Sequence, residues 1–338
     1  MQFNTTNSYH QYSQYAQLVA QIGFVSTTFF CFILIFLTMF WVTRKFGSYK
    51  YLLIIFPTFG IVFATIELVL YPNVHSYNAG FVYYSTHHPF NFGKEAVTWL
   101  IALYSGVYAT TISLLSVQFL YRYWAVFDET KLRYFKGWKF LFSLAYAFSV
   151  GVVWALILYY LDKMDDYSKS YMKNEMCQKY AIDINEIAGV IVVAYDTTGS
   201  IRWLNVSCTL GMTFIMLFQY TIIISCAVQM YSDMEAKLGM LSPSLRTLHQ
   251  QFFKTLVIQI VTPTCTLFFP VMLIIHLPLL DLELSLPTGI FLCAFTLYPA
   301  MDAAIVMYIV QDYRKAVKQK LKAFFETMVA MLTVSTSK

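Results

Sequence analysis

Hydrophobic residues occur in this chain in seven long runs, which are separated by shorter polar stretches. A helix needs about 20 mostly apolar residues to cross the hydrocarbon layer of a membrane, and every run has that length. The runs are Leu18–Val42, Tyr51–Tyr71, Val97–Leu120, Phe140–Leu161, Leu204–Met230, Thr255–Leu277 and Pro287–Val310. None of them alternates in polarity as the strands of a membrane barrel do. The pattern therefore predicts an all-α membrane protein built as a bundle of seven transmembrane helices.

The same runs divide the chain into segments. We expect an N-terminal arm over residues 1–17, a membrane domain over residues 18–310 and a short tail over residues 311–338. The longest connection within the membrane domain is a loop over residues 162–203. No internal repeat is visible in the sequence, which argues against a transporter built from inverted repeats.

The composition agrees with a membrane protein and excludes the soluble classes. Hydrophobic residues make up 58% of the 338 residues and charged residues only 12%. A soluble domain carries about 25% charged residues, and the mean hydropathy of +0.58 leaves too few polar residues for a wet surface. Disordered, coiled-coil and disulfide-rich secreted proteins are excluded by the same numbers.

Lysine and arginine are distributed unevenly between the two sides of the predicted membrane domain. If the N-terminus lies outside, 17 of the 23 basic residues are cytoplasmic and 6 are extracellular. Positive charge is retained on the cytoplasmic side during insertion, so we expect the N-terminus outside and the C-terminus inside. A glycosylation sequon at Asn4, in the N-terminal arm, agrees with this orientation.

The predicted spans contain few groups that could do chemistry. The third span has no acid that could pair with an amine ligand, and the six histidines lack the spacing of a metal site. Nothing in the sequence therefore indicates an enzyme, a cofactor, a metal or a nucleic-acid partner.

Neutral side chains of the third, fifth and sixth spans are instead the candidates for a ligand cavity. They are Trp99, Tyr104, Tyr108, Thr111, Thr209, Met212, Thr213, Phe268, Phe269 and Met272. Such a lining suits a small, neutral, fairly apolar ligand held by dispersion and one or two hydrogen bonds. Each of these residues could instead serve only to pack helices.

Two acids lie inside the predicted spans, at Glu67 and Asp302. Charge in hydrocarbon is costly and is usually functional or paired. Asp302 is either a switch residue at the cytoplasmic mouth of the bundle or a carboxylate hydrogen-bonded to neighbouring helices. Glu67 either lines a ligand cavity or is a structural acid.

Prolines indicate where the helices bend. Pro57 lies in the second span, Pro263 and Pro270 in the sixth and Pro299 in the seventh. Each proline removes a backbone hydrogen bond and predicts a kink. A kinked sixth helix offers a pivot for its cytoplasmic end, although proline is also simply common in membrane helices.

The cytoplasmic side has two further features. Arg122 lies at the inner end of the third span, where it is either an arginine that changes partners on activation or an interfacial anchor. After the last span, apolar residues recur at helical intervals from Tyr313 with basic residues between them. This pattern predicts an amphipathic helix on the inner leaflet, in contact with anionic membrane lipid.

Six short segments of the chain match a known family in order and spacing. They are Gly47–Leu52, Glu67–Pro72, Gln118–Tyr123, Leu248–Gln259, Tyr298–Asp302 and Asp312–Arg314. With these segments the chain resembles the nematode serpentine chemoreceptors of the Str type, together with the related class r and class j receptors. The resemblance covers nearly the whole chain.

The resemblance implies a G-protein-coupled receptor in the plasma membrane of a chemosensory neuron or its cilium. Such a receptor binds a small-molecule odorant and activates a heterotrimeric G protein. By position, Arg122 corresponds to the arginine that ends the third helix of G-protein-coupled receptors generally, and Pro299 to the proline of their seventh-helix switch. The chain departs from the rhodopsin-like pattern, as is expected within the nematode group: Tyr121 replaces the acid before that arginine, Asp302 replaces the switch tyrosine, and Cys177 lacks its usual disulfide partner. The candidates for switching and G-protein coupling are Arg122, Tyr121, Lys254, Pro270, Pro299 and Asp302.

Other classes of seven-span protein remain as alternatives. A ligand-gated odorant channel of the insect type keeps its N-terminus inside, which the distribution of basic residues disfavours. Another kind of seven-transmembrane receptor or a transporter is a further alternative, whereas a heptahelical hydrolase would need a cytoplasmic histidine cluster that the sequence lacks. The sequence specifies neither the ligand, the G-protein subtype nor the oligomeric state.

Overall fold

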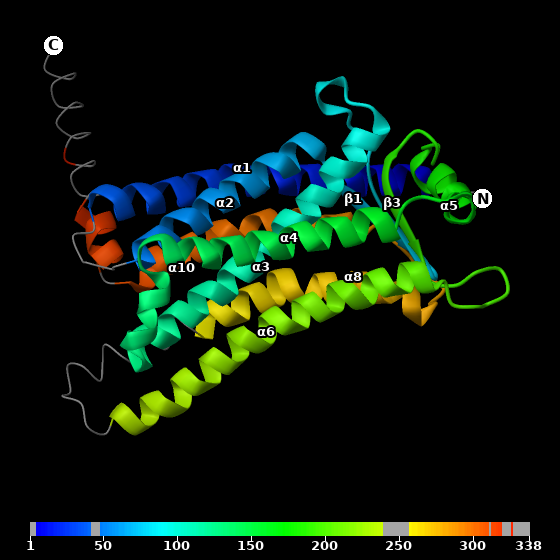
Figure 1. The fold of residues 1–338 in the computed structure, drawn as a ribbon. Helices are drawn as coiled ribbons and strands as arrows, with labels where there is room; N and C mark the ends of the chain where they lie inside the picture. The colour runs from blue at the N-terminus through cyan, green and yellow to red at the C-terminus, as the bar shows by residue number, and fades with distance from the viewer. Residues whose placement is uncertain (1–4, 42–47, 239–256, 311, 320–325, 327–338) are drawn as a thin grey trace, which may run out of the picture.

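The computed structural model of the chain describes residues 5–41, 48–238, 257–310, 312–319 and 326. In this part of the chain, seven helices are long and apolar enough to cross a membrane, and they lie side by side in one elongated bundle (Figure 1). They are Gln11–Phe40, Tyr49–Leu70, Lys94–Ala125, Gly137–Leu161, Trp203–Ser232, Val257–Leu280 and Gly289–Ile309. The predicted seven-helix membrane bundle is confirmed. Asn4, Lys254 and most of the tail lie outside the described residues.

The first five spans are single helices, whereas the last two are interrupted. The helices of the first five spans are α1 (Thr5–Phe40), α2 (Tyr49–Leu70), α3 (Lys94–Phe127), α4 (Phe140–Leu161) and α6 (Trp203–Leu238). The sixth span joins helical residues 257–263, a π-helical turn η4 (Thr264–Phe268) and α8 (Phe269–Leu280). The seventh joins α9 (Gly289–Cys293), a 3-10 turn η5 (Ala294–Leu297) and α10 (Tyr298–Ile309). The distortion expected at the prolines of the sixth and seventh spans is therefore present, whereas α2 runs as one helix through Pro57.

α3 is the central helix of the bundle. Of its most apolar window, 78% is buried inside the protein, against 28% for α4. α3 and α4 cross closely at Gly106 and Gly151. The two backbones are so near that a Cβ atom on either glycine would collide with the backbone carbonyl of the other. Small residues at such crossings let membrane helices approach through their backbones.

A four-stranded antiparallel sheet covers one end of the bundle. It consists of β1 (Asn73–Tyr77), β2 (Gly80–Ser85), β3 (Ala188–Val193) and β4 (Ser285–Leu286), in the order β3-β2-β1-β4. The tight turn between β1 and β2 uses Asn78 at a φ of 44°, a backbone angle that asparagine tolerates well. The hydropathy pattern had indicated no strand in these segments. We call this end of the bundle the sheet end and the opposite end the Arg122 end.

The sheet has two buried faces because side chains alternate along a strand. On β2, Phe81 and Tyr83 pack onto the helix bundle, whereas Val82 and Tyr84 pack under a further helix, α5 (Asp166–Tyr180). Sheet and α5 thus form two layers over the end of the bundle, beside the start of α1 (Figure 1). The expected loop over residues 162–203 supplies α5 and β3, and therefore most of this roof.

α1 extends further toward the sheet end than the hydropathy pattern predicts. It begins at Thr5 rather than at Leu18, and its first turns contact the sheet. The Tyr9 hydroxyl donates to the Ser285 carbonyl oxygen at 3.1 Å, and the Asn73 amide donates to the Ser13 hydroxyl at 3.4 Å. These contacts stabilise the helical conformation of the polar residues of α1 that precede the apolar span.

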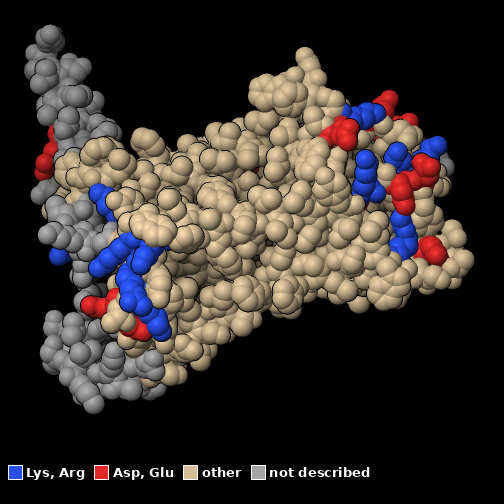
Figure 2. All heavy atoms as spheres, in the orientation of Figure 1, with Lys and Arg blue, Asp and Glu red and all other residues tan. Residues whose placement is uncertain are grey.

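Charged side chains gather at the two ends of the molecule. Figure 2 shows a wide band without lysine, arginine, aspartate or glutamate between the charged ends. The 3-10 turns η2 (Glu129–Phe135) and η3 (Gly137–Lys139) carry basic residues at the Arg122 end. An uncharged band of this kind is what the hydrocarbon of a bilayer requires.

Candidate functional site

A cavity of about 60 Å³ lies below the sheet, between α3, α4, α6, α8 and the seventh span. Val74, Phe81 and Tyr83 from the sheet form its roof. Its walls are aliphatic and aromatic apart from Ser105, whose hydroxyl accepts a hydrogen bond from the Trp154 ring nitrogen at 2.7 Å. A single water needs roughly 10–15 Å³ of such space, so the cavity has room for only a few heavy atoms.

Three of the ten predicted ligand residues line this cavity. They are Tyr104 and Tyr108 on α3 and Met212 on α6. Both tyrosines are buried, and the Tyr104 ring stacks on Phe63 at a centroid distance of 4.8 Å. α3 therefore presents its aromatic face to the cavity, as the sequence suggests.

The other seven predicted ligand residues are not among the side chains that line the cavity. Thr111 and Thr213 donate to carbonyl oxygens of their own helices, Trp99 stacks on Tyr159, and Phe268 packs on Tyr220. Phe269 points out of the bundle with 64% of its surface exposed. Trp99, Thr111, Thr209, Thr213, Phe268, Phe269 and Met272 thus lie outside the cavity lining.

Glu67 lies behind the cavity wall. It is completely buried in α2, beside the Tyr104 hydroxyl and the Cys293 thiol. Neither its carboxylate oxygens nor the Tyr104 hydroxyl makes a hydrogen bond of normal geometry in the described part of the chain. This placement, behind a tyrosine rather than in the cavity, favours the structural interpretation of Glu67.

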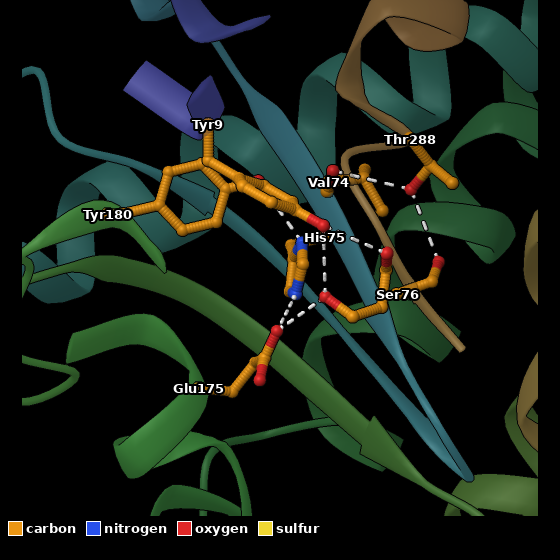
Figure 3. Close-up of polar contacts among 8 residues, drawn as sticks. Tyr9, Val74, His75, Ser76, Glu175, Tyr180 and Thr288 are labelled. Carbon is orange, nitrogen blue, oxygen red and sulfur yellow. Dashed lines mark hydrogen bonds and ion pairs between the residues drawn. The ribbon is translucent and has the colours of Figure 1, made fainter. Parts of the chain in front are cut away.

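A polar group of five residues, which we call the His75 cluster, ties the roof together. His75 on β1 is fully buried, with Nε2 at 3.1 Å from Glu175 Oε1 and Nδ1 at 3.1 Å from the Tyr180 hydroxyl of α5 (Figure 3). The Ser285 hydroxyl of β4 donates to the same Glu175 oxygen at 2.6 Å, and Tyr9 of α1 donates to the Ser285 carbonyl. The imidazole joins β1 to α5, and the cluster as a whole links α1, β1, α5 and β4, which come from four separate parts of the chain.

The His75 cluster predicts that the roof loosens in acid. Burial opposes ionisation of Glu175, but hydrogen bonds from His75 and Ser285 outweigh it and hold its pKa below the ordinary value of 4.5. The ionised carboxylate then stabilises the roof at pH values above 4.5, and this contribution is lost as the pH falls through the lowered pKa. As the pH falls below 4.5, we expect the amide hydrogens of residues 73–77 and 175–180 in the purified protein to lose protection, measured as exchange relative to the intrinsic rate at the same pH. A Glu175→Gln variant should lose this pH step, and an unchanged step in the variant would contradict the prediction.

A second buried network, which we call the inner network, lies at the Arg122 end and contains Arg122, Tyr49, Gln259 and Asp302. The Arg122 side chain is 8% exposed, and its Nε donates to the Tyr49 hydroxyl of α2 at 2.7 Å. Another of its nitrogens donates to the side-chain oxygen of Gln259 in the sixth span. The Gln259 amide nitrogen donates in turn to Asp302 Oδ1 of α10 at 3.0 Å. Arg122, Gln259 and Asp302 thus connect the third, sixth and seventh spans in one chain of hydrogen bonds.

Of the remaining switch candidates, those that the structure describes lie around this network or in the interrupted spans, and Lys254 lies outside the described residues. The Tyr121 ring stacks on Tyr49 at a centroid distance of 5.2 Å, next to the guanidinium group of Arg122. Pro270 is in the first turn of α8, directly after the π-helical turn. Pro299 lies in the first turn of α10 and packs on Gly60 of α2, where a side chain larger than hydrogen would collide with it.

Comparison with known proteins identifies the family. The family model of the serpentine type 7TM GPCR chemoreceptor Str matches residues 16–318. This chain belongs to the Str chemoreceptor family. The Str receptor is 34% identical over 310 residues to the G-protein coupled receptor str-33 of Caenorhabditis elegans, which covers 90% of each chain.

More distant relatives carry the names of two neighbouring receptor classes. The serpentine receptor class r-10 of Caenorhabditis elegans is 28% identical over 280 residues, 81% of each chain. The serpentine receptor class J-38 of the same organism is 21% identical over 302 residues, 88% of this chain and 89% of its own. The family resemblance expected from six short segments is confirmed, and the family is one of receptors rather than enzymes.

Two residues of this Str receptor's inner network were not among the sequence-based candidates. Tyr49 and Gln259 both lie in the segments that carry the family resemblance, but no role had been assigned to them. Gln259 is 2% exposed in an apolar span, and a buried amide of that kind needs partners. A search for neutral polar residues, rather than acids alone, would have found it.

The cysteines of the receptor are unpaired. All six are free in the structure, and Cys177 is exposed on α5. The roof at the sheet end is therefore held by the sheet, by α5 packing and by the His75 cluster rather than by a disulfide.

Proposed function

We propose that this receptor binds a small, neutral, largely apolar odorant in the cavity below the sheet and activates a heterotrimeric G protein at the Arg122 end. The cavity lining supports the ligand class, since it is aliphatic and aromatic and contains no charged side chain. An apolar enclosure of this kind binds ligands through dispersion and exclusion of water. The small volume favours a compact molecule.

The observation that carries the proposal is that one helix connects the two ends. Tyr108 on α3 lines the cavity, and Arg122 on the same helix holds the inner network. At 1.5 Å per residue the two positions lie about 21 Å apart along the helix axis. A rigid central helix between a cavity and a polar network is suited to transmit occupancy from one to the other.

We further propose that the receptor lies in the plasma membrane, with the sheet end outside. The distribution of basic residues along the sequence supports this orientation. The described start of the tail helix also supports it, since Tyr313 and Ala316 are buried while Arg314, Lys315 and Lys318 are exposed. These basic residues would face anionic lipid of the inner leaflet.

The test is a ligand screen in cells that express the receptor with a promiscuous G protein. Volatile ketones, aldehydes, esters and alcohols are applied beside water-soluble and charged compounds. We expect responses to small neutral compounds. A response confined to cations would contradict the proposed ligand class, because no acid lines the cavity.

A substitution that fills the cavity should reduce the response. Val271 on α8 lines the cavity and is 8% exposed, so Val271→Phe places a ring in the space that the ligand needs. Because the added ring takes space from the ligand, we expect roughly a tenfold higher ligand concentration for half-maximal signalling, which corresponds to about 1.4 kcal/mol of binding free energy. The matched control is Val261→Phe on the lipid-facing side of the same span, where Val261 is 53% exposed. Equal potency in both variants would contradict the cavity as the binding site.

The ligand-gated channel is the second candidate, and topology separates it from the receptor. An epitope tag on the N-terminus should be stained on intact cells if the sheet end faces outside. Staining only after permeabilisation would favour the channel, whose N-terminus lies inside.

A further inference from the structure

Tyr108 contacts three functional parts of the receptor at once. Its ring lines the cavity, and its buried hydroxyl donates to the backbone carbonyl of Leu267 at 3.0 Å. The ring also stacks on Phe295 at a centroid distance of 5.3 Å, with an interplanar angle of 29°. Leu267 belongs to the π-helical turn of the sixth span, and Phe295 to the 3-10 turn of the seventh.

Both turns depart from the α-helical pitch, so each could change to a regular α-helical turn. π-helical turns are rare and occur mostly as single turns at functional positions. The turn follows Pro263, and the next helix begins with Phe269 and Pro270, so prolines flank it on both sides. If it changed to α-helical pitch, the residues on its two sides would rotate relative to each other about the helix axis.

The segments beyond these turns carry the inner network. Gln259 precedes the π-helical turn and Asp302 follows the 3-10 turn, and both belong to the hydrogen-bond chain that starts at Arg122. A rotation at the π-helical turn would therefore move Gln259 relative to Arg122. Because Tyr108 contacts both Leu267 and Phe295, a change in the cavity that moves its ring acts on both interrupted spans.

We propose that Tyr108 is a positioning residue that holds the π-helical turn of the sixth span in its resting pitch, and that a ligand in the cavity acts by displacing its ring from Leu267. This inference rests on the proposed function for its signalling part. The Trp154 ring, 6.0 Å away and fixed by its bond to Ser105, supports the Tyr108 ring from the side of α4. The displacement therefore acts on the Leu267 bond and on the Phe295 stack.

The test is Tyr108→Phe, which keeps the ring and removes only the hydroxyl. Loss of one buried neutral hydrogen bond should shift the resting equilibrium by about fivefold. We expect about that increase in ligand-independent signalling per surface receptor, and faster amide hydrogen exchange in residues 264–268 of the purified protein. The ligand should also act at lower concentration, because the active conformation is already more populated.

Tyr159→Phe is the matched control. It removes a tyrosine hydroxyl that donates to Glu95 Oε1 at 3.1 Å between α4 and α3, away from the sixth and seventh spans. We expect wild-type exchange in residues 264–268 and wild-type signalling per receptor. If Tyr108→Phe is not displayed at the surface, Phe295→Leu provides the second variant, because loss of the ring stack frees the Tyr108 ring that makes the Leu267 bond. We expect faster exchange in residues 264–268 of this variant too, and unchanged exchange would overturn the positioning role.

The outcomes distinguish this inference from the proposed function. Unchanged exchange in residues 264–268 of Tyr108→Phe would overturn the positioning role, whether or not the receptor signals. Faster exchange in Tyr108→Phe, combined with ligand-independent signalling equal to that of Tyr159→Phe, would also overturn the positioning role, because Tyr108 would then act only in packing. Faster exchange in a receptor that activates no G protein under any condition would support the tie to the π-helical turn and sink the proposed function instead.

Discussion

Arg122→Ala is expected to abolish G-protein activation at every ligand concentration while the receptor still reaches the cell surface. Arg122 supplies the buried positive charge at the end of α3, bonded to Tyr49 and Gln259. An arginine changes partners readily because its five donors can bind another carbonyl or carboxylate. Under the proposed function, the G protein contacts Arg122 when the sixth span moves, and alanine removes the positive charge that this contact requires.

The control for this variant removes an arginine from the same end of the bundle. Arg133 in η2 is exposed and contacts the hydroxyl of the adjacent Tyr134, so Arg133→Ala changes the net charge equally. We expect it to signal to within about twofold of wild type, since an exposed pair contributes little. G-protein activation is measured as a function of ligand and normalised to surface staining. Full signalling by Arg122→Ala would refute the role of this residue.

Gln259→Leu is expected to raise ligand-independent signalling by tens of fold. Gln259 is the bridge of the inner network, because it accepts from Arg122 and donates to Asp302. Hydrogen bonds to charged groups contribute about 1.5–3 kcal/mol each, and 1.4 kcal/mol corresponds to a tenfold change in an equilibrium constant. Leucine fills a similar volume in the apolar span, so packing is retained while the third and sixth spans are released.

The matched control is Gln219→Leu. Gln219 is also a buried glutamine that joins spans, with hydrogen bonds to Ser116 of α3 and Tyr146 of α4 at 2.7 Å each. It has no contact with Arg122 among the described hydrogen bonds, so we expect resting signalling near the wild-type level. Equal basal activity in the two variants would show that Arg122, Gln259 and Asp302 do not form a restraint on activation.

The helical part of the fold could be predicted from the sequence because it depends on local composition. Seven apolar runs suffice to specify seven spans, since each must cross the same thickness of hydrocarbon. Pro263, Pro270 and Pro299 likewise indicated where the sixth and seventh spans depart from a regular helix, because proline acts on its own turn. The form of the departure, a π-helical turn in one span and a 3-10 turn in the other, was not predictable.

The sheet could not be predicted in the same way. Its strands come from three connections that lie far apart along the chain, and β4 contributes only Ser285 and Leu286. The run Val190–Val193 is rich in β-branched residues and favours a strand, but its partners appear only in three dimensions. The assignment of α5 and β3 to one loop therefore missed the roof of the cavity.

The candidate site was predicted unevenly for a related reason. Tyr104, Tyr108 and Met212 were found because α3 and α6 present one face to the bundle centre. Phe269, directly after the π-helical turn, is also aromatic but points out of the bundle. Periodicity alone cannot place a side chain beyond such an interruption.

The two-layer roof has a kinetic consequence for any molecule that arrives from the sheet end. Val74, Phe81 and Tyr83 close the cavity from above, and α5 covers them in turn. Association must then wait for the roof to open, and it proceeds more slowly than free diffusion would allow. The same opening limits departure, so a gate of this kind slows arrival and escape equally and leaves the equilibrium constant unchanged. How quickly a response rises and fades would be set by the roof, and how strong it becomes by the cavity beneath it.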